Sequence, residues 1–368
     1  MKLIKRPINR LKHDKDQIVF PTLQFEMLPN EVIRQVFSYL KLVDLLNCGH
    51  VSKRFRAISI DDQYLWPKKV NLCNRSVPVG FLRKLLDSGC KYLSLSQAVL
   101  KGTLNLPVES KLKYLNLNGF ALKCDRQNPE KILKSCYSLQ KLSLSKFQLS
   151  TKLINITSLQ NGKTLKVLDL SKCTFDRSHR YEDSSKCELD CVQQIVENCT
   201  ELNELSLSMI HFCEMSIDLL VSNLTPKIEK LDLFDNYCLS DKHVKKLVTR
   251  CNEIKELNLG GCNCLTRQSL NFIIDNLKLS LVKLSYESTF VTFNTSDLFK
   301  LKKMEKLKLL FYDGNVDNIE LFQIGWLKRL MPNLWIKFNP GNRSIAIPCL
   351  PECNRQGFWE IKARQEVI

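Results

Sequence analysis

The 368-residue sequence predicts an α/β protein in which a short block of three helices precedes a curved solenoid of about ten strand-helix repeats. Two observations support this fold class. A leucine frame recurs along most of the chain, mostly every 22–27 residues, and an apolar stripe with helical spacing lies ahead of it. The predicted parts are a basic tail over residues 1–26, the helical block over 27–67, the repeats over 68–338 and a C-terminal tail over 339–368.

The helical block is predicted from LPNEVIRQVFSYLKLVDLLNCGHVSKRFRAISIDDQYLW, residues 28–66. Pro29 suits a first helical turn, and the apolar residues from there to Leu40 form one broad stripe. We expect a second helix that Asp44 caps and a third that carries Phe55. A segment of about 40 residues rarely folds alone. Its apolar residues therefore either pack on the rest of the chain or meet a partner.

The repeats are predicted from the frame LxxLxL. Clear copies end at Leu117, Leu144, Leu170, Leu207, Leu233, Leu259, Tyr286 and Leu309, and weaker copies surround Val70, Leu93 and Leu334. These copies give eleven expected strands, and the stretches between them, such as Ser240 to Cys251, have helical spacing. One strand and one helix in each repeat of this length is typical of leucine-rich repeats, which stack into a solenoid.

One spacing is too long for this period. It lies between Leu168 and Leu205, and the excess falls in the polar segment DRSHRYEDSSKCELD from Asp176 to Asp190. We interpret this segment as a loop insertion, because polar insertions in repeat proteins usually lie in loops.

The chain has sixteen cysteines, and many of them follow the repeat. Cys136, Cys199 and Cys251 each precede the central leucine of the next strand by six residues. Positions in phase with the core indicate packing of reduced thiols, and no second cysteine pair lies at zinc-finger spacing. The five histidines are scattered and suggest no catalytic set. We expect a protein that is not an enzyme and needs no metal or cofactor.

The net charge of +17 raises the question of nucleic-acid binding. The lysines are spread along the chain without aromatic interleaving or a finger motif, so we rank this function below protein binding. No apolar run is long enough for a membrane span. We expect the nucleus and cytoplasm, and the basic cluster between Lys2 and Lys15 is either an import signal or a solvated tail.

The helical block resembles the F-box. The residues that match the pattern of that family are Leu28, Pro29, Glu31, Phe37, Leu40, Asp44, Leu45, Leu46, Val51, Lys53, Phe55 and Trp66. An F-box directly before leucine-rich repeats implies a non-catalytic substrate receptor of a Skp–Cullin–F-box ubiquitin ligase. In that family the F-box binds the Skp-type adaptor and, through it, the cullin and RING subunits.

For this sequence the resemblance implies a set of adaptor-binding residues. They are Leu28, Pro29, Ile33, Phe37, Leu40, Leu45, Leu46, Val51 and Trp66. Two alternatives stay open: a helical cap on a scaffold or inhibitor without a ligase role, and an F-box receptor whose client is unrelated to the cell cycle.

The C-terminal end narrows the resemblance. MPNLWIKFN, followed by about 20 residues and FWEIKAR, resembles the ending of the S-phase kinase-associated branch of the family. This implies that the tail folds back on the concave face. It also implies a phosphorylated client such as a Kip-type cyclin-dependent kinase inhibitor, held with help from a Cks-type subunit. Where that branch uses a tryptophan, an aspartate and an arginine for the Cks-type subunit, this chain has Met209, Gly261 and Ser288.

The client-binding face follows from the strand alternation. With the frame leucines inward, the residues on either side of each central leucine face the concave side. Lysines gather at these positions in the C-terminal repeats, namely Lys230, Lys283, Lys306 and Lys308. They can hold an acidic or phosphorylated segment of a client, or they are solvated lysines partly covered by the tail.

Overall fold

The computed structural model describes residues 27–61, 65–66, 68–102, 110–122, 129–175, 181–291, 293–312, 329–338 and 345–346. The chain forms two compact units, residues 1–66 and 67–368, and we describe each by itself. The basic tail over residues 1–26 lies outside the described residues, as does the C-terminal tail apart from residues 345–346. None of the described helices combines the length and the hydropathy that a membrane span requires.

The first unit contains the three expected helices. They are α1 (Asn30–Phe37), α2 (Leu42–Cys48) and α3 (Lys53–Arg56), and a π-helical turn over Ala57–Asp61 follows α3. Ile33, Phe37, Leu45 and Phe55 are buried at its centre, where the rings of Phe37 and Phe55 meet edge to face with centroids 5.5 Å apart. This small aromatic core gives the block an interior of its own.

Polar contacts fix the helix ends of this unit. The Ser52 hydroxyl caps α3 by accepting the N–H of Phe55 at 3.1 Å. The Arg54 guanidinium donates to Asn30 Oδ1 at 2.9 Å and to the Leu28 carbonyl at 2.5 Å, and so joins α3 to the start of α1. The expected cap at Asp44 is wrong, because α2 begins two residues earlier and Asp44 lies in its first turn.

The second unit is a solenoid with one long sheet. Its parallel strands are β1 (Lys69–Asn71), β3 (Tyr92–Ser94), β5 (Tyr114–Asn116), β7 (Lys141–Ser143), β9 (Val167–Asp169), β11 (Glu204–Ser206), β12 (Lys230–Asp232), β13 (Glu256–Asn258), β14 (Lys283–Tyr286), β15 (Leu309–Tyr312) and β16 (Trp335–Phe338). A short β17 (Ile345–Ala346) pairs antiparallel with β16. These strands confirm the eleven predicted from the sequence.

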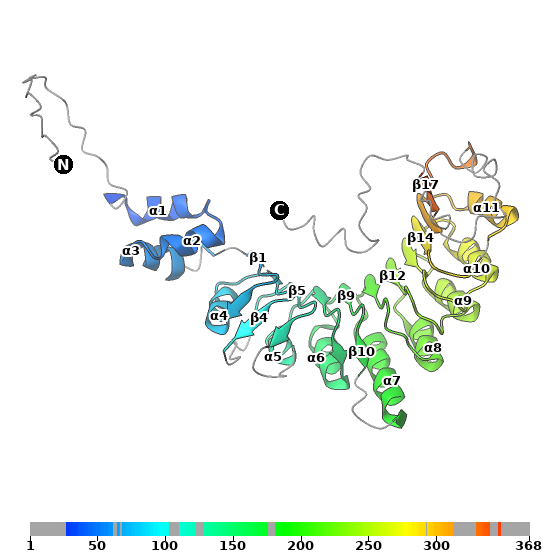
Figure 1. The fold of residues 1–368 in the computed structure, drawn as a ribbon, viewed down its shortest axis with the longest axis horizontal. Helices are drawn as coiled ribbons and strands as arrows, with labels where there is room; N and C mark the ends of the chain where they lie inside the picture. The colour runs from blue at the N-terminus through cyan, green and yellow to red at the C-terminus, as the bar shows by residue number, and fades with distance from the viewer. Residues whose placement is uncertain are drawn as a thin grey trace, which may run out of the picture. The chain divides into compact units, whose positions relative to one another are not determined.

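Helices cover the outer side of this sheet. They are α4 (Val79–Asp87), α5 (Glu130–Leu133), α6 (Thr151–Asn161), α7 (Tyr181–Asn198), α8 (Glu214–Asn223), α9 (Asp241–Arg250), α10 (Arg267–Leu277) and α11 (Thr295–Lys300). Figure 1 shows the strands along the inner, concave side of the solenoid and the helices along the outer side. Short strands in the connections form two small sheets, with β2 (Ser76–Pro78), β4 (Val99–Lys101) and β6 (Ala121–Leu122) in one, and β8 (Gln148–Leu149) and β10 (Thr174–Phe175) in the other.

The predicted loop insertion is largely wrong. Residues 181–190 form the first half of α7, which runs for 18 residues and reaches farther outward than its neighbours in Figure 1. Farther along this helix, Cys191, Val192 and Ile195 are buried. The Glu188 carboxylate is also buried and accepts the N–H of Cys213 at 2.7 Å. A polar segment is compatible with a helix here because most of its outer side faces water.

The last clear frame was assigned three residues too early. In β15 it is Leu310, not Leu307, that pairs with the central Leu284 of β14, and Ile336 of β16 pairs with Leu310. The sequence LKLLFY allows both frames, because Leu307 also fits the first position of LxxLxY. In the observed frame the central residues of β14, β15 and β16 are 26 residues apart, as in the preceding repeats.

The cysteine prediction is confirmed for the thiols in phase with the repeat. Cys136, Cys199 and Cys251 are at most 2% exposed. Burial raises the pKa of Cys251 to about 11 and that of Cys199 to about 12. These thiols fill the core and are poor nucleophiles. Within the described residues, no group of three or more His, Cys, Asp or Glu side chains is placed to hold a metal ion.

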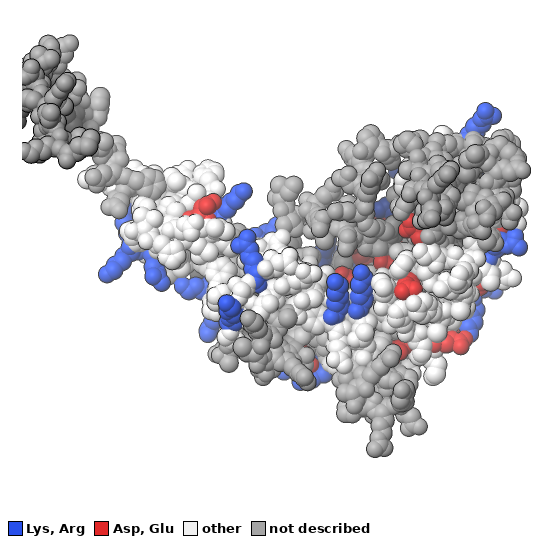
Figure 2. All heavy atoms as spheres, viewed as in Figure 1, with Lys and Arg blue, Asp and Glu red and all other residues white. Residues whose placement is uncertain are grey.

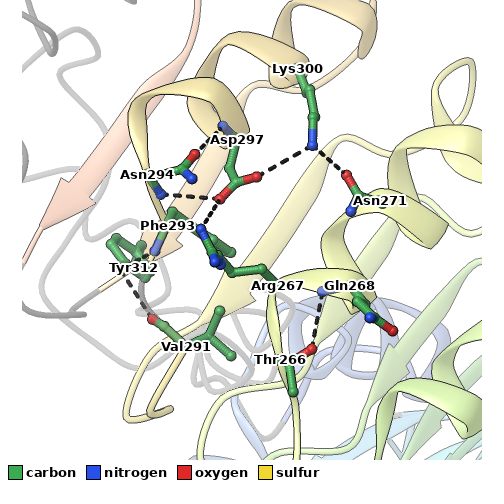
Figure 3. A network of polar contacts seen from close by, with 10 residues as sticks. All are labelled: Thr266, Arg267, Gln268, Asn271, Val291, Phe293, Asn294, Asp297, Lys300 and Tyr312. Carbon is green, nitrogen blue, oxygen red and sulfur yellow. Dashed lines mark hydrogen bonds and ion pairs between the residues drawn. The ribbon is translucent and has the colours of Figure 1, made fainter.

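A buried polar network fixes the turn between β14 and α11 (Figure 3). Asp297 and Asn294 exchange reciprocal bonds with each other's backbone N–H, at 3.1 and 2.9 Å. Arg267 and Lys300 approach the same carboxylate at 3.9 and 3.4 Å. Nearby, the Tyr312 hydroxyl accepts the N–H of Phe293 and donates to the carbonyl of Val291. The network closes the C-terminal repeats without exposing backbone groups in their interior.

Candidate interaction surfaces

The helical block presents many apolar side chains to solvent for its size. They are Met27 (71% exposed), Val32 (40%), Val36 (40%), Tyr39 (83%), Val43 (51%) and Val51 (65%). Val32 and Val36 are one helical turn apart and therefore lie on the same side of α1. Exposed apolar side chains at this density indicate a surface for a protein partner.

The predicted adaptor-binding residues fall into three groups by exposure. Ile33, Phe37, Leu45 and Trp66 are buried, with at most 3% exposed. Leu28, Leu40 and Leu46 are half-buried, and Pro29 and Val51 are exposed. The four buried side chains support the surface from within and cannot form it.

Sequence reasoning missed Val32, Val36, Tyr39 and Val43 as surface residues. The stripe on α1 combines two adjacent rows, in which Ile33 and Phe37 face inward while Val32 and Val36 face outward. A stripe broader than one buried face was the available signal for a second, partner-facing side.

On the concave face, two of the predicted client-binding lysines are already paired. Lys230 Nζ lies 3.2 Å from Glu204 and 3.3 Å from Glu256, and Lys283 Nζ lies 3.2 Å from Glu256. Glu204, Lys230, Glu256 and Lys283 occupy the same position on β11 to β14 and are adjacent in register. We name this set the alternating charge row. Opposite charges cancel along it, so these two lysines are not free to bind an anion.

The other two predicted lysines are not on the strands at all. Because of the frame shift at β15, Lys306 lies in the turn before that strand, and Lys308 directly precedes it. The concave positions of β15 hold Leu309 and Phe311, and the Phe311 ring meets Trp335 of β16 edge to face at 5.5 Å. The predicted cluster of four lysines is therefore not present as one site.

Beside the alternating charge row lies a row of serine, asparagine and aspartate side chains. The Ser143 hydroxyl lies 2.5 Å from Asp169 Oδ2, and the Ser206 hydroxyl lies 3.3 Å from Asp232 Oδ2. Asp232 Oδ1 also accepts the N–H of Phe234 at 3.0 Å. Burial, reinforced by the nearby Asp169 charge, raises the pKa of Asp232 to about 7. The row joins neighbouring repeats, and burial limits its access to a ligand.

Met209, Gly261 and Ser288 share one backbone role. Each is the third residue after the last concave position of its strand, and each has a left-handed φ of 56° to 69°. Asn74, Gln97, Gly119, Lys146, Lys172 and Asp235 occupy the same turn position in other repeats. At Gly261 a Cβ atom would meet the Asp235 backbone at 3.0 Å, so this turn favours glycine. None of the three positions presents an aromatic ring or a charge.

Comparisons with known proteins agree with this architecture. The chain matches the family model of the SKP2 LRR domain over residues 80–366 and that of an F-box-like domain over residues 25–71. Among solved structures it is similar to the crystal structure of the Rad7 and Elc1 complex in yeast, with a TM-score of 0.50 and 18% identity over 83% of this chain and 87% of that chain. It is also similar to the leucine-rich repeat-containing protein LegL7 from Legionella pneumophila, with a TM-score of 0.44 and 16% identity over 75% of this chain and 92% of that chain. At 18% identity, the first likeness shows the fold alone.

Proposed function

Because the chain belongs to the family of the SKP2 LRR domain and carries an F-box-like domain before its repeats, we propose that it recruits a Skp-type adaptor and presents a client protein to an SCF-type ubiquitin ligase. The F-box followed by leucine-rich repeats is the architecture of a substrate receptor. The role in such a complex is to hold two proteins together.

The exposed apolar side chains of the first unit carry the adaptor part of the proposal. A monomeric block of this size gains nothing by leaving Val32, Val36, Val43 and Val51 in water, whereas an adaptor groove would bury them. Covering two valines that are now 40% exposed adds roughly 1 kcal/mol of apolar burial each.

The test is co-elution of the full chain with a Skp-type adaptor on a sizing column. Val32→Glu/Val36→Glu places two charges on the outer side of α1 without touching the buried Ile33 and Phe37, and we expect it to abolish co-elution. Gln35→Glu/Asn47→Glu adds the same charge at other exposed positions of the block and is expected to co-elute normally. If the valine variant still co-elutes while circular dichroism shows both variants folded, α1 does not bind the adaptor.

The client is the second part of the proposal. The left-handed turns at Met209, Gly261 and Ser288 offer neither the aromatic ring nor the charges that the family resemblance implies for a Cks-type subunit. Such anchors often contribute about 2 kcal/mol or more each to an interface. We therefore favour a client that contacts the repeats directly. Addition of a Cks-type subunit to the adaptor complex is expected to leave its elution volume unchanged, and a stable shift would contradict this.

A further inference from the structure

Basic and aromatic side chains share the concave face of the N-terminal repeats. Lys69, Tyr92, Tyr114 and Lys141 occupy the same position on β1, β3, β5 and β7 and are adjacent in register. The rings of Tyr92 and Tyr114 lie 6.4 Å apart, and Tyr92 is 43% exposed. Aromatic interleaving, absent along the sequence, therefore exists across the sheet.

More lysines border this row where the strands begin. Lys91, Lys113 and Lys166 directly precede β3, β5 and β9. With Lys69, Tyr92, Tyr114 and Lys141 they make up what we name the basic–aromatic face. Among the described residues, none of these five lysines forms an ion pair, whereas in β11 to β14 Lys230, Lys255 and Lys283 all do. Figure 2 shows Lys and Arg side chains predominating over the N-terminal repeats, with Asp and Glu gathering toward the C-terminal ones.

The spacing of these side chains suits an extended peptide. Neighbouring strands lie about 4.8 Å apart, so the four-strand row spans about 14 Å, which an extended chain covers with about five residues. The lysines are close enough for their fields to add at a Debye length of about 10 Å. Tyrosine rings give an apolar surface together with a hydroxyl that can donate to a carboxylate.

We infer that the basic–aromatic face binds an extended acidic segment of a partner protein, with an aromatic or apolar residue of that segment on the two tyrosines. The inference rests on the proposed function, since the partner would be the client of the receptor. It places the client at the opposite end of the solenoid from the lysines that the sequence suggested. The absence of arginine from the face favours carboxylates over the phosphates of a nucleic acid, which arginine recognises by paired hydrogen bonds.

The first experiment measures the fluorescence anisotropy of a labelled twelve-residue peptide made of aspartate and glutamate around one tryptophan, with the full chain bound to its adaptor. We expect binding that weakens with salt. Lys91→Glu/Lys113→Glu/Lys141→Glu should weaken it at least about tenfold. The control Lys131→Glu/Lys134→Glu/Lys163→Glu makes the same charge change at exposed lysines outside the face and should change it less than about twofold.

Two further variants separate binding from folding and from bulk charge. Tyr92→Ala/Tyr114→Ala leaves the charge unchanged and should weaken binding about threefold or more. The triple glutamate variant should gain affinity for a lysine version of the probe, which an unfolded protein would not do selectively. Equal losses in the triple variant and its control would overturn the inference.

Two other occupants would also overturn it. A twelve-nucleotide single-stranded DNA that binds more tightly than the peptide and fails with the same variant would make the face a nucleic-acid site. If the full chain binds the peptide only when Phe358 and Trp359 are changed to alanine, the face belongs to the chain's own tail. The adaptor test is independent, because the triple variant should still co-elute with the adaptor and Val32→Glu/Val36→Glu should still bind the probe.

Discussion

Removal of the Glu256 carboxylate tests whether the alternating charge row holds neighbouring repeats together. Glu256 is the one carboxylate of that row that contacts two lysines, with Lys230 Nζ at 3.3 Å and Lys283 Nζ at 3.2 Å. Glu256→Gln keeps the shape of the side chain and its ability to hydrogen-bond, and it removes the charge. Lys230 then keeps Glu204, while Lys283 loses its acidic contact in the row.

The expected cost follows from the burial of the three side chains. Lys230 and Glu256 are only 12% and 16% exposed, and Lys283 is 31% exposed, so solvent screens these pairs less than surface pairs. Exposed ion pairs contribute about 0–1 kcal/mol, and removing one partner of a fully buried pair costs about 3–5 kcal/mol. Since the row lies between these limits, we expect Glu256→Gln to lower the free energy of unfolding by about 2 kcal/mol.

The assay is urea unfolding followed by circular dichroism, with Glu229→Gln as the matched control. Glu229 precedes the same sheet by one position and pairs with Lys255 at the shorter distance of 2.7 Å, but these side chains are 40% and 50% exposed. The control should therefore cost less than about 1 kcal/mol. Equal losses for the two variants, or no loss for Glu256→Gln, would refute the reasoning that burial rather than distance sets the value of these pairs.

Three further predictions concern buried groups. Because the folded-state pKa of Asp232 is raised to about 7, its carboxylate destabilises the fold increasingly as pH rises from about 4 to 7, so Asp232→Asn should gain about 1–3 kcal/mol relative to wild type between pH 5 and pH 8 in urea titrations. A difference that stays constant with pH would contradict this. Asp297→Ala should lower the unfolding free energy by about 2–3 kcal/mol, because it leaves Arg267, Lys300 and the Asn294 N–H without their shared acceptor; thermal unfolding beside Asp275→Ala, an exposed position on α10, checks it. At pH 8 the exposed thiol of Cys264 should react with iodoacetamide in the native protein while Cys199 reacts only in urea, as mass spectrometry of the labelled peptides would show.

Sequence was sufficient for the strands because each of them places leucines at fixed offsets in every repeat. It was insufficient at β15, where Leu307, Leu309 and Leu310 satisfy two frames and only pairing with Leu284 selects one. It also misjudged α7, since hydropathy cannot separate a solvated loop from a helix that buries a few side chains near its middle.

The interaction surfaces were harder to predict than the fold, for a physical reason. Whether a lysine is free depends on side chains about 26 residues away on either side, as Glu204 and Glu256 show for Lys230. Likewise, on α1 only tertiary packing decides that Ile33 turns inward and Val32 outward. Neither relation is contained in a local pattern.

The same backbone produces two different electrostatic surfaces from one rule. Side chains at equivalent positions of successive repeats become neighbours across strands about 4.8 Å apart, so the order of residues in steps of one repeat sets the local field. Glutamate and lysine alternate from β11 to β14, and their charges cancel. From β1 to β7 two tyrosines separate two lysines, and the positive charges remain uncompensated by any ion pair among the described residues. A solenoid of this kind can therefore confine anion binding to one end of a continuous sheet without any change in fold, because only the residue at one position of each repeat has to differ.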